Sequence, residues 1–359
     1  MTVRTRFLAP VVAIALVTAA CTRPGDEPNR GTDGSTAPVV VTLLTHDSFD
    51  VSRSVVRAFE RESGIELRIV PSGDAGQLVN RAILTAGNPE GDVLFGIDDT
   101  LFPKAVGASV FEPYESPELD RVDDGLELDP THAVTPIDRG DVCLNVDRGW
   151  FEERDLAPPA GIADLTDPVY RGLTVVENPA TSTPGLAFLL ATVARFGEQA
   201  WETFWRDLRA NDVLVVDGWE QAYFGEFSGA GGGEGERPIV VSYATSPVAE
   251  VVFAEEPLER APTAAITDSC YRQVEFAGVL AGTEHPDEAR EVIDFLLSRA
   301  FQEDVPLRMF VFPVADDAEL PEEFERWATE PASPLVLPPE QVATGREGWV
   351  QTWTDVMFG

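Results

Sequence analysis

Positive charge is scarce in this chain. Its 359 residues include 26 lysines and arginines against 62 aspartates and glutamates, which gives a formal net charge of −36, and Lys104 is the single lysine. Proteins bind phosphate backbones through basic patches, so we expect no nucleic-acid partner. An acidic exterior instead raises the local concentration of cationic ligands.

Histidine and the common catalytic motifs are also scarce. The three histidines are His46, His132 and His285, and none stands in a metal-binding or nucleophile motif. The G-x-S-x-G, Walker and dinucleotide-binding patterns are absent. Asp98 and Asp99 form a carboxylate pair suited to acid–base work, but acidic loop residues are abundant here. We therefore expect no enzyme, no metal site and no cofactor.

The first of only three cysteines indicates the compartment. Arg4 and Arg6 precede the apolar stretch "FLAPVVAIALVTAA", which is too short to span a bilayer, and Cys21 follows at once, as in a bacterial lipobox. We interpret residues 1–20 as a signal peptide and residues 21–38 as a flexible tether whose Cys21 carries a lipid. The protein is then expected outside the cytoplasm, anchored to the cell membrane. The alternative is an ordinary secretory signal with an incidental cysteine.

The two remaining cysteines, Cys143 and Cys270, form an even pair in a compartment that permits disulfides. We expect them to be bonded to each other. Two buried free thiols are the alternative.

The order of strand and helix patterns predicts an α/β protein. From Val39 to "GDVLFGIDD" the order is β-α-β-α-β, which is typical of a parallel sheet with helices on its faces. After residue 138 a similar order repeats less regularly. We expect two lobes, at residues 39–140 and 141–275, joined by two crossing strands that carry Cys143 and Cys270. Residues 276–359 are expected to return to the first lobe and end in helices.

Polar and aromatic residues follow several of these strands. Ligands bind beyond the carboxyl ends of parallel strands, so we single out His46, Asp47, Ser48, Asp74, Asp98, Trp219, Tyr223 and Tyr243. Rings beside carboxylates suit a flat cationic ligand, although each ring alone suits a protein core equally well. The "TSTPG" turn at residues 181–185 begins a helix, where Thr181, Ser182 or Thr183 would cap the first N–H groups or would face an anion.

Several of these stretches resemble one known family. "THDSF", "NPATSTPGLAFLL", "DGWEQAY", "VVSYATSP" and "YRQVE" occur in the order found in thiamine-binding periplasmic proteins, the soluble receptors of bacterial thiamine ABC importers. The resemblance covers nearly all of the chain from Val39 onward. It implies a two-lobed type II periplasmic-binding fold, with the ligand in a cleft between lobes joined by two hinge strands. It also implies thiamine or its mono- or diphosphate as the ligand, and an ABC permease as the membrane partner. We expect a monomer.

The resemblance also implies roles for single residues. Trp219 and Tyr243 would contact the thiamine rings, and Asp47 and Ser48 would line the first-lobe side of the cleft. The hydroxyethyl or phosphate arm would lie at Ser182, opposite Asp74. The counter-charge of the thiazolium would come from one of three acidic residues: Asp98, Asp99 or Glu275.

Three positions depart from the family pattern. His46 and Ala249 stand where the family has tyrosines, and Phe310 stands where it has a tryptophan. Phe310 can still stack on a ring, and a protonated His46 can pair with a phosphate. The reduced aromatic cage leaves the exact ligand open. The alternatives are a ferric-iron receptor, a polyamine receptor and a secreted thiamine-degrading enzyme with a cysteine nucleophile. The tyrosines include no adjacent pair, which counts against iron.

Overall fold

The structure is a computed structural model that describes residues 38–231 and 235–359. The expected signal peptide and Cys21 lie outside these residues. None of the helices that the structure describes is long and apolar enough to cross a bilayer.

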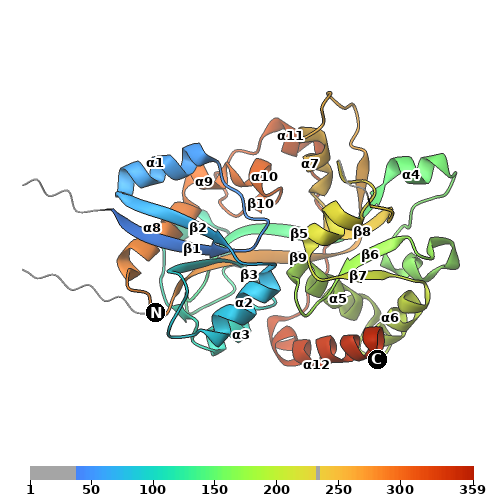
Figure 1. Ribbon diagram of the computed structural model, residues 1–359, viewed down its shortest axis with the longest axis horizontal. Coiled ribbons are helices and arrows are strands. Elements are labelled where there is room, and N and C mark those ends of the chain that lie inside the picture. Colours follow the sequence, from blue (N-terminus) through green and yellow to red (C-terminus); the bar gives the residue numbers. More distant parts are fainter. Residues whose placement is uncertain (1–37, 232–234) are drawn as a thin grey trace, which may run out of the picture. The chain divides into compact units, whose positions relative to one another are not determined.

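The described part of the chain begins with the predicted β-α-β-α-β unit, which we call the first lobe together with the later helix α8 (Figure 1). Strand β1 pairs in parallel with β2 on one side and with β3 on the other. The first helix ends at Gly64, which has a φ of 75°, a left-handed conformation that glycine adopts without steric cost. The elements are β1 (Val39–Thr45), α1 (Arg53–Ser63), β2 (Ile65–Pro71), α2 (Ala75–Leu84), β3 (Val93–Asp98), α3 (Phe102–Gly107), β4 (Phe111–Glu112) and α8 (Pro286–Leu297).

A second α/β unit, the second lobe, is built around three short strands. Strand β6 pairs in parallel with both β7 and β8, and buried helix α5 packs against the sheet. The elements are α4 (Arg148–Glu153), β6 (Thr174–Glu177), α5 (Thr183–Phe196), α6 (Trp201–Ala210), β7 (Leu214–Val216), a π-helix at Gln221–Glu226, β8 (Ile239–Tyr243) and α7 (Ser246–Val252).

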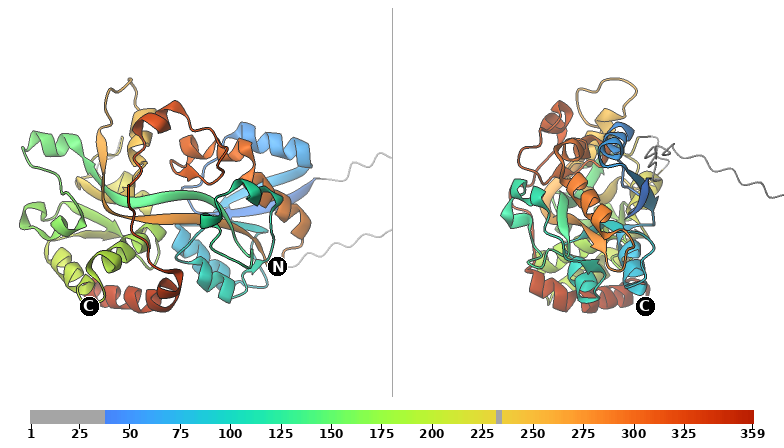
Figure 2. Two further views of the ribbon diagram at one scale, coloured as in Figure 1. Left: turned by 180° about the vertical axis from the view of Figure 1, so that it is seen from behind. Right: turned by 90° about the vertical axis from the view of Figure 1, so that its left-hand side faces the viewer.

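Two long strands, β5 (Thr135–Asp147) and β9 (Thr263–Leu280), connect the lobes. They pair with each other antiparallel along most of their length, and Figure 2 shows them side by side from behind. Strand β3 of the first lobe pairs with β9, and β8 of the second lobe pairs with β5, so one sheet of order β2-β1-β3-β9-β5-β8-β6-β7 runs through both lobes. The expected α/β architecture with two crossing strands is confirmed.

The expected disulfide is confirmed as well, because Cys143 of β5 is bonded to Cys270 of β9. The bond lies where the β5–β9 register is interrupted. Val142 pairs with Tyr271 and Leu144 with Ile266, so β9 carries extra residues opposite Cys143. The disulfide therefore holds the two crossing strands together where their regular pairing is broken.

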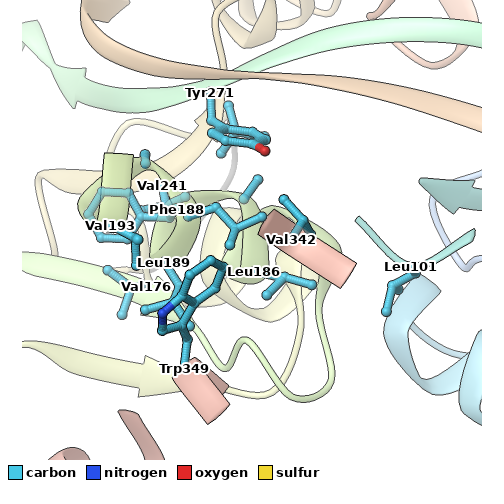
Figure 3. Packing of buried hydrophobic residues seen from close by; sticks show 14 of the residues in the cluster. Leu101, Val176, Leu186, Phe188, Leu189, Val193, Val241, Tyr271, Val342 and Trp349 are labelled. Carbon is cyan, nitrogen blue, oxygen red and sulfur yellow. The ribbon is translucent and has the colours of Figure 1, made fainter. Parts of the chain in front are cut away.

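The C-terminal segment begins in the first lobe, where Phe301 and Val305 join the core, and then passes to the second lobe. Its elements are α9 (Arg299–Gln302), α10 (Val305–Arg308), β10 (Phe312–Pro313), α11 (Glu322–Trp327) and α12 (Pro339–Phe358). Helix α11 packs on α7, and α12 packs on α6 and α5. Figure 3 shows side chains of this shared core, with those of α5 gathered near α12 and β9: Leu186, Phe188, Leu189, Val342, Trp349 and Tyr271. The last helix thus completes the core of the second lobe.

Removal of the disulfide should lower the free energy of unfolding by about 3–5 kcal/mol, because the bond closes a loop between residues 127 positions apart. Guanidinium unfolding of the oxidised protein and of the Cys143→Ala/Cys270→Ala variant measures the difference. Wild-type protein unfolded in reductant is the matched control and should behave like the variant. Equal midpoints for the oxidised protein and the variant would contradict this expectation.

Candidate functional site

A cavity of about 770 Å³ opens at the carboxyl ends of the parallel strands of both lobes. The first lobe contributes the residues that follow β1 and β2, from His46 to Asp50 and from Gly73 to Ala75. The second lobe contributes the start of α5, the segment after β7 and the end of β8. A cavity at this position fits the general rule for ligand sites in parallel sheets.

Most of the predicted ligand-binding residues line this cavity. Its wall includes His46, Asp47, Ser48, Asp74, Thr183, Trp219, Tyr223, Tyr243 and Phe310. Ala249, one of the three positions named above as departures from the family pattern, lines it too. The two predicted residues outside the wall are Asp98 and Ser182, and both side chains are buried.

Asp98 lies beneath the cavity and not in its wall. One carboxylate oxygen accepts a hydrogen bond from the Thr100 hydroxyl at 2.7 Å, and the other accepts one from the Gln273 amide at 2.8 Å. The Gln273 carbonyl oxygen accepts a hydrogen bond from the Tyr243 hydroxyl at 2.8 Å. Burial raises the pKa of Asp98 to about 6 although these hydrogen bonds oppose the shift. Asp98 therefore positions Tyr243 through Gln273.

The "TSTPG" turn is not capped by its own hydroxyl groups, contrary to the simplest expectation. Ser182 is the N-cap residue of α5 but its side chain makes no capping hydrogen bond. The Thr181 hydroxyl donates to the backbone carbonyl of Asp217 at 2.7 Å. The carboxylate of Asp74, from the first lobe, instead accepts the backbone N–H groups of Thr183 at 3.3 Å and of Trp219 at 3.1 Å.

Asp74 is therefore the polar link between the lobes at this end of the cavity. Burial raises the pKa of its carboxyl group, and the Trp219 N–H, the charge of His46 and the Ser182 hydroxyl act in the opposite direction. The backbones approach closely beside it. A Cβ atom on Gly76 would lie 2.6 Å from the carbonyl oxygen of Thr181, so only glycine permits this contact.

Aromatic rings form one wall of the cavity. The ring of Trp219 stacks on that of Tyr223, with centroids 5.1 Å apart and an interplanar angle of 17°. Both rings are anchored by hydrogen bonds, from the Trp219 indole N–H to the Ser242 hydroxyl and from the Tyr223 hydroxyl to Glu250. The Tyr243 ring lies edge-on to Trp219 at 6.4 Å. These hydrogen bonds and ring contacts hold the rings of this wall in place.

Sequence reasoning missed two aromatic residues at the rim of the cavity. The side chains of Phe224 and Phe253 both line it and are 53% and 73% exposed. Phe253 packs against Phe310, with centroids 5.5 Å apart, and Phe224 packs edge-on against Trp219. Their proximity in sequence to Tyr223 and Ala249 is the one signal that pointed to them.

The charges around the cavity are mostly negative. Its lining includes two groups that can carry positive charge, Arg308 and His46, and Arg308 is paired with Asp50. The acidic lining residues are Asp47, Asp50, Asp74, Asp217, Glu220, Glu250 and Glu275. The cavity thus favours a cationic ligand over an anionic one.

Glu275 alone among the three proposed counter-charges lines the cavity. It stands in a row of carboxyl groups across three neighbouring strands, because it pairs with Asp98 of β3 on one side and Asp138 of β5 on the other. Burial and the charge of Glu275 raise the pKa of Asp138 well above its ordinary value. Burial therefore favours the neutral form of Asp138, and Glu275 is the member of this row that lines the cavity.

The described residues offer neither a thiol nucleophile nor a preformed metal site. Cys143 and Cys270, the two cysteines in the described part of the chain, are bonded to each other. Within residues 38–231 and 235–359, no group of three or more His, Cys, Asp or Glu side chains is arranged to hold a metal ion. The geometry supports the capture of a ligand.

Comparisons with known proteins agree with this geometry. Residues 88–331 match the family model of the bacterial extracellular solute-binding proteins. The chain is 32% identical to the thiamine-binding periplasmic protein of Salmonella typhimurium, and the match covers 88% of this chain and 93% of that protein. It is 31% identical to the thiamine-binding periplasmic protein of Escherichia coli, and this match covers 89% of this chain and 94% of that protein. A solved periplasmic thiamin-binding protein superposes with a TM-score of 0.78 at 28% identity, covering 89% of this chain and 96% of the other. Iron-bound HitA from Pseudomonas aeruginosa superposes with a TM-score of 0.70 at 19% identity, and the match covers 89% of this chain and 99% of HitA. This likeness shows the same fold.

The substitution Gly76→Ala should keep the lobes from meeting at Asp74. Its added methyl group would overlap the Thr181 carbonyl, and such overpacking costs about 1–3 kcal/mol, or roughly a tenfold to hundredfold loss of affinity for the ligand in the cavity. Calorimetric titration measures the affinity, and small-angle scattering should show a larger radius of gyration.

Gly107→Ala is the matched control, because a Cβ atom at the end of α3 meets no atom within 4 Å. It should leave both the affinity and the scattering unchanged. Identical binding by Gly76→Ala and wild type would show that close approach at this point is not needed.

Proposed function

Since this chain belongs to the bacterial extracellular solute-binding proteins and, among them, to the family of thiamine-binding periplasmic proteins, we propose that it captures thiamine outside the cell membrane and delivers it to a membrane permease. The observation that carries the proposal is the acidic cavity between the lobes, with Trp219 on its wall and Glu275 on its floor. No bond is made or broken in this function. The lobes close over the ligand about β5 and β9.

The chemistry of thiamine matches the two sides of this cavity. Its thiazolium ring carries a fixed positive charge, which suits the carboxylate of Glu275, and its two flat aromatic rings suit the faces of Trp219 and Tyr243. Asp47 and Ser48 offer polar contacts from the first lobe, and Phe310 offers a further ring. Attraction of the cation and stacking of the rings together select this ligand class.

We place the hydroxyethyl arm of thiamine beside Thr183 and Asp74, which both line the cavity. There Asp74 already accepts the N–H groups that an anion would otherwise bind. The neutral hydroxyl of thiamine fits this arrangement better than a phosphate, since a phosphate must displace the Asp74 carboxylate or lie next to it. We therefore place thiamine first among the candidates, ahead of its mono- and diphosphate.

The cellular setting follows from the N-terminal sequence and from the relatives, which are named periplasmic proteins. We propose that residues 1–20 are a signal peptide and that a lipid on Cys21 anchors residues 21–38 as a tether to the membrane. In this setting the folded part acts as a monomer beside an ABC permease. The acidic charge argues against nucleic acid as a partner.

Ferric iron is the second candidate ligand, because iron-bound HitA shares the fold. Tyr223 and Tyr243 both line the cavity, and tyrosine oxygens can ligate ferric iron. Their hydroxyls are, however, engaged with Glu250 and Gln273. A thiamine-degrading enzyme is disfavoured by the disulfide, which removes both thiols of the described residues from nucleophilic chemistry.

Calorimetric titration of the purified protein with thiamine, its two phosphate esters, spermidine and ferric citrate tests the proposal. We expect sub-micromolar binding of thiamine and weaker binding of the esters. Absence of any heat or thermal shift with thiamine, together with binding of spermidine or a ferric absorption band, would replace thiamine with that ligand.

Replacement of Trp219 by alanine should weaken thiamine binding by about fivefold to 30-fold, because ring stacking and cation–π contact contribute roughly 1–2 kcal/mol. The same titration measures the loss. Trp150→Ala is the control, since the Trp150 ring packs on Phe151 and lies outside the cavity lining. Equal losses in the two variants would point to general destabilisation instead of ligand contact.

A further inference from the structure

We propose that His46 is the resident cation beside Glu275 and that a cationic ligand takes over this role, so that binding of the ligand releases a proton from His46. This inference rests on the proposed function, because it requires a cation to enter the cavity. It assigns a specificity-determining role to His46.

The geometry places His46 against the carboxylate that would neutralise the ligand. Its Nε2 lies 3.7 Å from a carboxylate oxygen of Glu275, and the two side chains are only 12% and 10% exposed. Both line the cavity. A ligand cation that approaches Glu275 therefore comes close to His46 as well.

The imidazole ring is held in this position by its surroundings. It packs against Phe95 with ring centroids 5.4 Å apart. The ring also lies against Gly96. A Cβ atom at this position would lie 2.4 Å from Cδ2 of His46, so any larger residue would collide with the ring. Gly96 also has a φ of 97°, which side chains rarely adopt. His46 has little freedom to move away from an incoming cation.

The charged groups that face His46 are all acidic. Glu275 comes from β9, Asp74 from the start of α2 and Asp47 from the residue that follows His46. Burial lowers the pKa of His46, but the charges of these three carboxylates outweigh it and raise the pKa above its ordinary value. The three carboxylates therefore favour the protonated form of His46, whose charge neutralises part of the acidic charge of the cavity.

A ligand cation beside Glu275 reverses this balance. Repulsion between the two cations lowers the pKa of His46, and its proton is released to the solvent. Below the pKa of His46 in the empty protein, affinity should fall by up to about tenfold per pH unit, because a proton must leave before the ligand binds. Above that pKa the affinity should no longer depend on pH through this group.

Carboxyl groups near the cavity could release protons by the same mechanism. Burial raises the pKa of Asp98 to about 6, and a nearby cation would lower it again. A variant that removes only the imidazole separates the two sources. His46→Gln keeps a polar side chain of moderate size and cannot be protonated in this pH range.

The test is calorimetric titration of the purified protein with thiamine between about pH 6 and about pH 8.5, in buffers with different ionisation enthalpies. We expect release of up to about one proton for each thiamine at the lowest pH, falling toward zero at the highest. His46→Gln should lose this release and should bind with a flatter pH profile. His285→Gln, at the start of α8 and outside the cavity lining, is the matched control and should behave like wild type.

The wild-type measurement keeps the test valid if His46→Gln does not fold. Thiamine binding without proton release, or release that persists undiminished in His46→Gln, would overturn this inference and leave the proposed function standing. A wild-type protein that binds no thiamine at any pH would overturn both.

Discussion

The antiparallel pairing of β5 with β9 is the constraint on which the rest of the molecule depends. These strands are the common members of both halves of the sheet, since β3 joins β9 and β8 joins β5. Backbone hydrogen bonds fix their register, and the Cys143–Cys270 bond holds them where the register is interrupted. The cavity lies between the lobes that these strands connect, so any movement that opens or closes it must bend or twist this pair.

The same pairing sets the electrostatics of the cavity. Register places Asp98, Glu275 and Asp138 side by side on three strands, an arrangement that is costly if all three are ionised. Burial and mutual repulsion favour the neutral form of the deeper groups, while Glu275 reaches the cavity. Asp74 has a different role, because its carboxylate accepts hydrogen bonds from backbone N–H groups of the opposite lobe. Hydrogen bonds thus help to account for the burial of Asp74 and Asp98.

Local patterns predicted much of this site because they reflect rules that act over short stretches of chain. Strand ends are recognisable from apolar runs that stop at polar residues, and the rule for parallel sheets then brings His46, Asp74 and Trp219 to one edge. Of the two alternatives for the start of α5, capping by its own hydroxyl groups is not found, and Asp98 is buried outside the cavity lining. In both cases the deciding partner, Asp74 for α5 and Gln273 for Asp98, comes from a distant part of the chain.

The sequence by itself determined the order of strands and helices, the acidic character of the protein and the presence of two cysteines able to pair. These properties depend on composition and on periods of a few residues. Only the tertiary structure decided that Glu275, and not Asp98, faces the cavity, that Phe224 and Phe253 form its rim, and that α12 completes the second lobe. Burial and charge of a side chain depend on which strands and helices lie opposite it, and folding alone brings those neighbours together.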